Sequence, residues 1–201
     1  MSEASTTTLT KTRRTVVTAM LSAIATILMY FNFSVPFMPE FIKFDIAELP
    51  ALLASFALGP QYGVIVCLIK NLFHLLSTST AGVGELSNFV LGVLFVLPAG
   101  LIYRIGKSRK SALIGAATGA VLMALGSLPL NYFVTYPFYM NLMPIEAIVS
   151  MYQAIIPSVD GLLACLLVFN VPFTLLKGIV STVITFVIYK PLSPIIKGKR
   201  H

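Results

Sequence analysis

Long apolar runs with almost no charged side chains dominate this chain and restrict the folds open to it. Of its 201 residues, 57% are hydrophobic and only 10% are charged, whereas soluble domains carry about 45–50% apolar and about 25% charged residues. An α-helix needs about 20 apolar residues to cross a bilayer core, so the chain has room for roughly five to seven crossings. The runs are apolar on all faces and do not alternate, which argues against a membrane β-barrel. A water-soluble enzyme, a disordered chain and a disulfide scaffold are excluded.

Six membrane spans are predicted from these runs. They cover residues 15–33, 49–58, 61–76, 86–102, 112 to about 136, and 172–189. The second run has only ten residues and would cover about 15 Å as a helix, so it needs a neighbour or an extended continuation to cross. The segment 137–170 is apolar but interrupted by prolines and acidic residues, which predicts short helices at the surface or partly inserted.

The positions of the charges predict the orientation. With a cytoplasmic amino terminus and six alternating spans, 11 of the 14 basic residues lie inside and six of the seven acidic residues lie outside, as the positive-inside rule requires. We therefore expect an all-α membrane protein with six transmembrane helices and both termini cytoplasmic. Its parts are a cytoplasmic segment 1–14, a six-helix substrate-binding domain 15–190 and a basic cytoplasmic tail 191–201. A cleaved signal peptide is the alternative for the first span, but the run is long for one.

Polar side chains gather near the outer ends of the predicted spans. Lys177 lies about six residues into the last span and shares a helical face with Thr174, and Asn131 lies late in the fifth span among tyrosines. A charge within a span is costly and usually faces a cavity or the bundle interior, and an asparagine offers both a donor and an acceptor. An interhelical hydrogen bond is the alternative for Asn131. Lys70 and His74 share another face, and snorkelling remains open for Lys70.

The segment between the first two spans alternates in polarity. Ile42, Phe44 and Ile46 alternate with Lys43 and Asp45, a period of two that predicts an extended segment with one apolar face. At membrane depth, non-helical backbone is tolerated only where it is covered or lines a cavity. The segment is therefore expected either to meet a ligand or to rest its apolar face on the bundle.

Catalytic and metal-binding motifs are absent from the sequence. It contains no HExxH, GxSxG or GxxxxGK[ST] pattern, and only two histidines and two cysteines without CxxC spacing, so neither a metal site nor a disulfide framework is expected. No basic stripe is interleaved with polar residues, so no nucleic-acid partner is expected. Carboxylates are missing from the middle of every span, where proton-coupled transporters typically carry them. Energy for active transport would have to come from another protein.

Two pairs of small residues are spaced four apart. Ala19 and Ala23 lie in the first span, and Gly115 and Gly119 lie in the fifth. Such spacing lets another helix approach closely. Each pair is therefore either a docking surface for a membrane partner or a packing site within the same bundle.

Five stretches resemble a known family. PFMPEFIKFDIAELPALLASFALGP, KNLFHLL, GVGELSNF, LNYFV and PFTLLKGIV are similar to the riboflavin-binding S-component of energy-coupling factor (ECF) vitamin transporters, over about residues 13–189. The resemblance implies six helices, a vitamin bound from the outside, and a membrane partner, the T-component, that carries two ATPase subunits. It also implies that the AxxxA pair, matched by Ala19 and Ala23, is the docking site for that partner.

The resemblance also implies a set of binding residues. It places the flavin ring against the first outer loop, with a further contact from the second outer loop. It also implies an asparagine at the polar edge of the ring and a lysine that binds the ring. The residues assigned in this way are Ile42, Phe44, Ile46, Gly84, Asn131 and Lys177. Thr174 joins this set because it shares a helical face with Lys177. The family often has asparagine three residues before the lysine, where this chain has Thr174, and an asparagine occurs one helical turn earlier at Asn170.

We therefore expect a multi-pass protein of the bacterial cell membrane that captures riboflavin outside and delivers it inward within an ATP-driven ECF transporter. It would carry no catalytic residue, metal or cofactor of its own, and it would not be an enzyme. One alternative is an S-component for another vitamin, such as thiamine or folate. Others are an intramembrane enzyme that uses Lys70, His74 or Asp160, and a structural membrane adaptor.

Overall fold

The structure is a computed structural model that describes residues 2–39, 42–78, 80–141 and 143–197, with side chains described within residues 11–189. Residues 198–201 of the predicted basic tail lie outside the described residues. The long helices are α1 (Ser2–Tyr30), α3 (Pro60–His74), α4 (Val83–Gly106), α5 (Arg109–Leu130) and α9 (Val171–Lys197). The shorter elements are α2 (Glu48–Ala57), α6 (Tyr136–Tyr139), α7 (Ile145–Gln153), α8 (Gly161–Cys165), the 3₁₀ turn η1 (Leu75–Ser77), and the π-helical segments η2 (Asn131–Thr135) and η3 (Leu166–Asn170).

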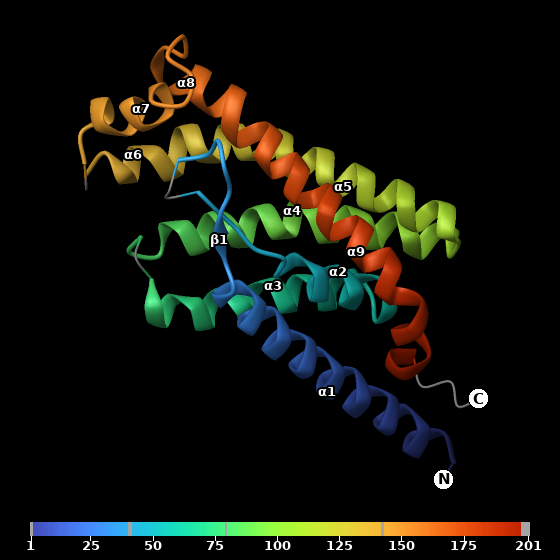
Figure 1. The fold of residues 1–201 in the computed structure, drawn as a ribbon. Helices are drawn as coiled ribbons and strands as arrows, with labels where there is room; N and C mark the ends of the chain where they lie inside the picture. The colour runs from blue at the N-terminus through green and yellow to red at the C-terminus, as the bar shows by residue number, and fades with distance from the viewer. Residues whose placement is uncertain (1, 40–41, 79, 142, 198–201) are drawn as a thin grey trace.

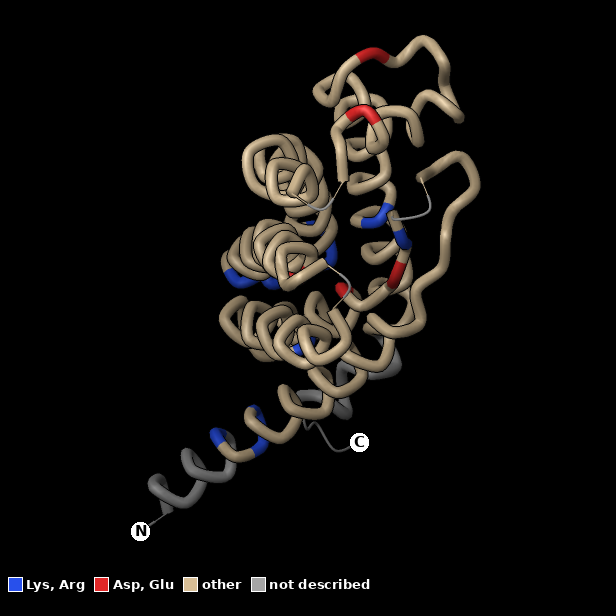
Figure 2. Tube along the Cα trace, turned by 90° about the vertical axis from the view of Figure 1, so that its left-hand side faces the viewer, with Lys and Arg blue, Asp and Glu red and all other residues tan. Residues whose placement is uncertain are grey.

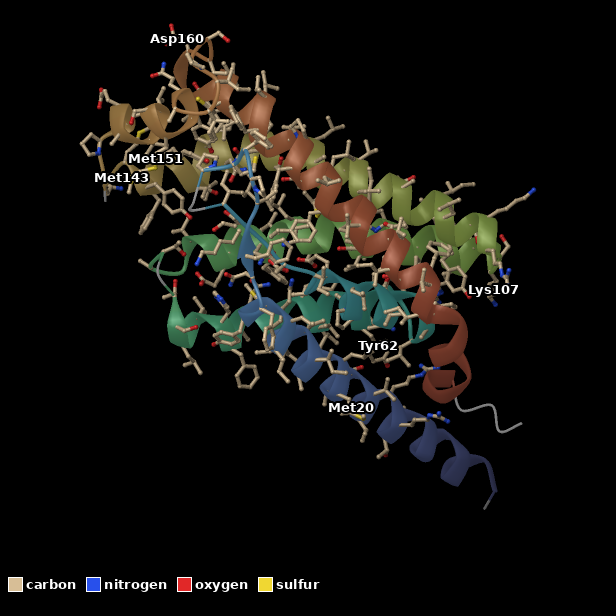
Figure 3. All side chains as sticks on the ribbon, viewed as in Figure 1. Met20, Tyr62, Lys107, Met143, Met151 and Asp160 are labelled. Atoms are coloured by element: carbon tan, nitrogen blue, oxygen red, sulfur yellow. The ribbon has the colours of Figure 1, made fainter. Side chains whose placement is uncertain are left out.

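The termini and the short helices lie at opposite ends of the molecule. Both termini are found at the lower right of Figure 1, and α6, α7 and α8 are found at the upper left. Asp160 lies at the α7–α8 end and Lys107, in the turn between α4 and α5, lies at the end of the termini (Figure 3). Figure 2 shows basic residues on the free part of α1 and acidic residues in the loops at the α7–α8 end. This separation of charge is the one that the sequence predicts for the inner and outer sides.

Four helices in the described part of the chain are long and apolar enough to cross a membrane. They are Lys11–Tyr30, Val83–Gly106, Arg109–Tyr139 and Gly161–Tyr189. The predicted second and third spans correspond to α2, which has 10 residues, and α3, which has 15. Gly59, with a φ of 127°, makes the sharp turn between α2 and α3. Together α2 and α3 form a helical hairpin next to α1 and α4 (Figure 1).

A short antiparallel pair of strands lies between α1 and α2. Strand β1 (Phe33–Ser34) pairs with β2 (Lys43–Phe44), with Phe33 opposite Phe44. At Lys43 and Phe44 the pairing confirms the extended conformation that the alternation of residues 42–46 predicts. The two strands cross the α9 side of the bundle below α7 and α8 (Figure 1).

The glycine pair of α5 packs inside the bundle. A Cβ at Gly115 would lie 2.6 Å from the carbonyl oxygen of Ala99, and a Cβ at Gly119 would lie 2.2 Å from that of Phe95. The backbone of α5 therefore rests directly on α4, as small residues at an interface allow. The spacing allowed either partner docking or packing within the bundle, and in the structure this pair packs within the bundle.

Three predicted boundaries are wrong. The predicted first span ends at Phe33, but α1 ends at Tyr30 and Phe33 belongs to β1. The predicted last span begins at Pro172, but its helix begins at Gly161. The predicted fifth span ends near residue 136, but its helix continues past Pro137 to Tyr139. Both prolines therefore lie inside continuous helices, and α7 is the part of the segment 137–170 that forms a separate short helix.

The two π-helical segments explain why these prolines do not break their helices. Each proline follows a π segment by two residues, because η2 ends at Thr135 and η3 ends at Asn170. A proline ring clashes with the carbonyl group four residues earlier, and for Pro137 and Pro172 that carbonyl belongs to a residue inside the π segment. The wider π turn, with its hydrogen bonds to the fifth residue, accommodates the ring. The helices therefore continue with one turn enlarged.

We expect Gly119→Ala to destabilise the protein, because the new methyl group would lie 2.2 Å from the carbonyl oxygen of Phe95. Overpacking of this kind costs about 1–3 kcal/mol. The measurement is thermal unfolding of the detergent-solubilised protein. The control is Ala117→Val, which enlarges an exposed side chain of the same helix and should leave the midpoint nearly unchanged. Equal midpoints for the wild type and Gly119→Ala would contradict the close packing of α4 and α5.

Candidate functional site

Two adjoining cavities form a cleft toward the α7–α8 end of the bundle. The first measures about 200 Å³ and the second about 670 Å³. Both are lined by Lys43, Asp45, Gly84, Asn88 and Tyr139, so they are parts of one space. Small-molecule sites commonly measure about 300–1,000 Å³, a size that the two cavities reach together.

The walls of the first cavity come from four parts of the chain that are far apart in sequence. These are the segment before α2, the first turns of α4, the end of α5 with η2 and α6, and the junction of η3 with α9. The remaining lining residues of this cavity are Ile42, Glu48, Ser87, Leu91, Met123, Asn131, Thr135, Tyr136, Asn170, Phe173, Thr174 and Lys177. The second cavity extends toward the end of α1 and the loop after α3, and its lining includes Met29, Tyr30, Asn32, His74, Thr80 and Glu85.

Five of the seven predicted binding residues line the first cavity. They are Ile42, Gly84, Asn131, Thr174 and Lys177. Phe44 and Ile46 are not among the described residues that line either cavity. The structure therefore brings together residues from all four walls that were selected from separate stretches of sequence.

The apolar side of the segment 42–46 packs onto the bundle at Phe44. The Phe44 ring is buried and meets Phe173 of α9 edge to face, with 6.0 Å between ring centroids. It also lies 5.4 Å from the ring of Phe33 on the paired strand. The charged residues of the alternating pattern, Lys43 and Asp45, line both cavities instead. Phe44 thus anchors the segment, and its polar side contributes to the cleft.

An ion pair joins this segment to α9. The Lys177 Nζ atom donates to Oδ2 of Asp45 at 2.9 Å, with 12% and 8% of the two side chains exposed. The backbone N–H of Ala47 donates to Oδ1 of the same carboxylate at 2.9 Å. Burial would raise the pKa of the Asp45 carboxyl, but the ammonium groups of Lys177 and Lys70 hold that pKa below its usual value. Asp45 is therefore ionised, and Lys177 has a charged partner at the cavity wall.

A second ion pair lies deeper, between α2 and α3. The Lys70 Nζ atom lies 2.6 Å from Oε1 of Glu48, with 0% and 2% of the side chains exposed. The Cys67 Sγ atom lies 3.7 Å from the other carboxylate oxygen. A Cβ at Gly92 would lie 3.0 Å from both that oxygen and Sγ, so α4 approaches the pair with only a hydrogen at this position. Lys70 therefore does not snorkel to a headgroup, but neutralises a carboxylate that lines the cavity.

Glu85 organises the loop between α3 and α4. Its Oε1 atom lies 2.8 Å from Nδ1 of His74. Its Oε2 atom accepts hydrogen bonds from the hydroxyls of Thr78 at 2.9 Å and Thr80 at 3.1 Å. A Cβ at Gly84 would lie 2.6 Å from the Thr80 hydroxyl oxygen. Gly84 is therefore required for close packing of this loop, and it meets the cleft through its backbone.

Several polar residues of the cleft carry no recognisable signal in the sequence. Ser87 and Thr135 line the first cavity and share a hydrogen bond of 2.6 Å that joins α4 to η2. Glu48 lines the same cavity, although its position in the sequence marks it only as one of the six acidic residues expected on the outer side. The sequence offers one signal for its partner, the opposite charge of Lys70 inside the next apolar run, since buried charges are normally paired. That signal does not distinguish pairing of Lys70 from snorkelling.

Comparisons with known proteins are consistent with this architecture. The family model described as "ECF transporter, substrate-specific component" matches residues 13–189. The riboflavin transporter RibU of Staphylococcus aureus (strain TCH60) is 34% identical over 185 residues, which cover 92% of this chain and 93% of the relative. The riboflavin transporter FmnP of Bacillus subtilis (strain 168) is 34% identical over 197 residues, which cover 94% and 97%. A solved structure described as the S component of a bacterial ECF transporter superposes with a TM-score of 0.74 at 33% identity, covering 94% of this chain and 99% of that chain.

We expect Lys70→Met to destabilise the protein strongly, because it leaves the buried Glu48 carboxylate without a counter-ion. Breaking a buried pair from one side costs about 3–5 kcal/mol. The double variant Lys70→Met/Glu48→Gln removes both charges and should recover most of the loss. Thermal unfolding in detergent measures both effects, with Lys43→Met at an exposed position as the control. A single variant as stable as the wild type would show that the pair does not stabilise the bundle.

Proposed function

We propose that this chain, which belongs to the family of substrate-specific components of ECF transporters, is the membrane subunit that captures riboflavin for such a transporter. The family match confirms the resemblance inferred from the sequence motifs, and a substrate-specific transporter component is a transport subunit and not an enzyme. The relatives named as riboflavin transporters, each 34% identical over nearly the whole chain, support riboflavin over another vitamin. Riboflavin is then the transported ligand and not a resident cofactor.

The observation that carries this proposal is the composition of the first cavity. Its lining combines the amides of Asn131 and Asn170, the Lys177 ammonium group and the aromatic rings of Tyr136 and Tyr139. The isoalloxazine ring of riboflavin is planar and has an edge that presents an acceptor, a donor and an acceptor. Aromatic side chains suit its faces, and amide groups suit its edge because each offers a donor and an acceptor.

Within this cavity we assign roles to the predicted residues. Asn131 would read the polar edge, Lys177 would donate to a ring carbonyl, and Thr174 would add a hydroxyl on the same helical face. Ile42 would contact the ring from the first outer segment, and Gly84 would contribute its backbone. Phe44 and Ile46 would hold that segment in place, a role supported by the contact of Phe44 with Phe173.

We further propose six transmembrane helices in the bacterial cell membrane, with both termini cytoplasmic. The four long apolar helices and the α2–α3 hairpin would make up the six spans. The location of both described chain ends at one end of the molecule (Figure 1) and the basic residues on the free part of α1 (Figure 2) support this orientation. The cleft then faces the outside, from which the vitamin would enter.

The partners in this proposal are a T-component and two ATPase subunits. Ala19 and Ala23 are exposed on α1, next to Met20, which is 60% exposed and points away from the bundle (Figure 3). This placement differs from that of Gly115 and Gly119, which are buried against α4. An exposed pair of small residues supports docking of a partner helix on α1, because close approach requires small side chains.

The test of the function is titration of riboflavin fluorescence with the purified, detergent-solubilised protein. We expect quenching without ATP, and Lys177→Ala should raise the Kd about 10- to 100-fold, because hydrogen bonds to charged groups contribute about 1.5–3 kcal/mol. Lys110→Ala, at the opposite end of the bundle, is the matched control and should leave the Kd unchanged.

Each outcome of the titration decides one part of the proposal. Folded wild-type protein that does not quench riboflavin, or that binds thiamine or folate instead, would overturn the assigned ligand. Quenching with equal Kd values for Lys177→Ala and Lys110→Ala would retain riboflavin but remove Lys177 from the site.

The double variant Ala19→Leu/Ala23→Leu tests the docking surface. We expect riboflavin binding by the isolated chain to persist, because both residues lie on the exposed face of α1 away from the cleft. Co-purification with the T-component and ATP-driven uptake should fall. Ala117→Leu, on the exposed face of α5, is the control for added bulk. Normal uptake, or joint loss of binding and uptake, would show that the pair is not a dedicated docking surface.

A further inference from the structure

Three buried polar side chains form a closed hydrogen-bonded ring beside the cavity. They are Tyr136 of α6, Tyr152 of α7 and Asn170 of η3, which are 2%, 0% and 8% exposed. The Tyr152 hydroxyl donates to Oδ1 of Asn170 at 2.8 Å, and Nδ2 of Asn170 donates to the Tyr136 oxygen at 3.2 Å. The hydroxyls of Tyr136 and Tyr152 are hydrogen-bonded to each other. Each member of the ring therefore contacts both of the others.

The direction of the third hydrogen bond follows from the first two. Tyr152 has one hydroxyl proton, which it gives to Asn170, so Tyr136 must be the donor to Tyr152. Every group in the ring then donates once and accepts once. Turning the amide of Asn170 over would require both phenolic protons to turn at the same time. The ring thus holds the amide in its place and couples its orientation to the two tyrosines.

The ring leaves part of the Asn170 amide for another partner. An asparagine amide has two N–H donors and two acceptor lone pairs, and the ring uses one of each. Asn170 and Tyr136 line the first cavity, whereas Tyr152 is not among the described lining residues. Asn170 also precedes Thr174 by four residues and Lys177 by seven, so the three lie on one helical face, and all three line the cavity.

The surrounding backbone holds the ring at the level of the cavity. Asn170 is the last residue of η3, and Tyr136 directly follows η2, with its N–H bonded to the carbonyl of Asn131. Tyr152 belongs to α7, which packs here through a cluster that includes Ile148 and Phe169. The ring therefore connects the two π-helical segments and the short helix at this end of the bundle.

We propose that Asn170 reads the imide edge of the flavin ring and that Tyr152 is a positioning residue, which acts on the ligand only through Asn170. This inference rests on the proposed binding of riboflavin. The two tyrosine hydroxyls occupy the edge of the Asn170 amide where its oxygen and nitrogen lie side by side, so the remaining N–H and lone pair point to opposite sides. The remaining N–H can donate one hydrogen bond to a carbonyl oxygen of the cyclic imide. Tyr152 determines how well that amide is aligned.

The test is a double-mutant cycle on riboflavin affinity with Tyr152→Phe and Asn170→Ala. Tyr152→Phe alone removes one neutral hydrogen bond from the ring and should raise the Kd about 3- to 10-fold. In the Asn170→Ala background the same substitution should cause no further change. Tyr103→Phe is the matched control, because the Tyr103 hydroxyl is also hydrogen-bonded to a tyrosine, Tyr189, in a cluster remote from the cavity lining.

The outcomes separate this inference from the proposed function. A wild type that does not quench riboflavin overturns the function, whereas a quenching wild type with an unchanged Kd in Tyr152→Phe overturns only the role of Tyr152. Additive effects of Tyr152→Phe and Asn170→Ala would also overturn it, because Tyr152 would then act independently of Asn170. A lowered unfolding temperature with unchanged Kd would leave the ring a purely structural role. If Tyr152→Phe does not fold, Tyr136→Phe opens the same ring and takes its place in the cycle.

Discussion

A charged side chain inside an apolar bundle has to be neutralised within the protein, and this requirement sets the position of the cleft walls. An unpaired charge in a span costs several kcal/mol (about 2.5–3.5 on insertion scales). The pair of Glu48 and Lys70 holds the start of α2 to α3, and the pair of Asp45 and Lys177 holds the preceding segment to α9. Asp45 and Glu48 are only three residues apart, so the two ion pairs fix one short stretch of the chain to α9 on one side and to α3 on the other. The non-helical segment before α2 is thereby kept against the bundle, where its polar side chains reach the cavity.

The two π-helical segments bring further polar groups to the same cavity. Both precede a proline by two residues, and both contain or adjoin residues of the cavity lining: Asn131 and Thr135 in η2, and Asn170 in η3. π turns inside α-helices are frequently found at functional sites, and here each of them lies two residues before a proline. The enlarged turn lets each helix continue into the α7–α8 end and also changes which side chains face inward. The enlarged turns and the polar lining of the cavity therefore occur at the same two places in the fold.

Local signals in the sequence were enough to predict part of this site. Lys177 and Asn131 are polar residues within apolar runs, so their inward orientation is the low-energy choice, and both line the cavity. The alternation of residues 42–46 predicted the extended segment, but which of its faces meets the cavity depends on Phe173 in another helix. The partner of Lys70 lies 22 residues away on α2, so sequence spacing alone could not separate pairing from snorkelling. The start of the last span was predicted wrongly at Pro172, because a proline normally begins a helix. Tyr152 lies on a short helix and contacts residues that are distant in the sequence, so no local sequence pattern predicts its role.

The contact of Gly92 with the buried pair of α2 and α3 has a consequence for how sequences of this family can diverge. A side chain at position 92 would press on the carboxylate of Glu48 and the sulfur of Cys67, and the same carboxylate neutralises Lys70. The residues at positions 48, 67, 70 and 92 therefore depend on one another: the carboxylate needs its counter-ion at position 70, and the carboxylate and the sulfur leave no room for a side chain at position 92. A relative with a smaller side chain at both positions 48 and 67 can accept alanine at position 92, whereas one that keeps Glu48 and Cys67 must keep the glycine. Substitutions at these positions should therefore be inherited as a set, so that covariation among them would trace the pair across the family even where overall identity is low.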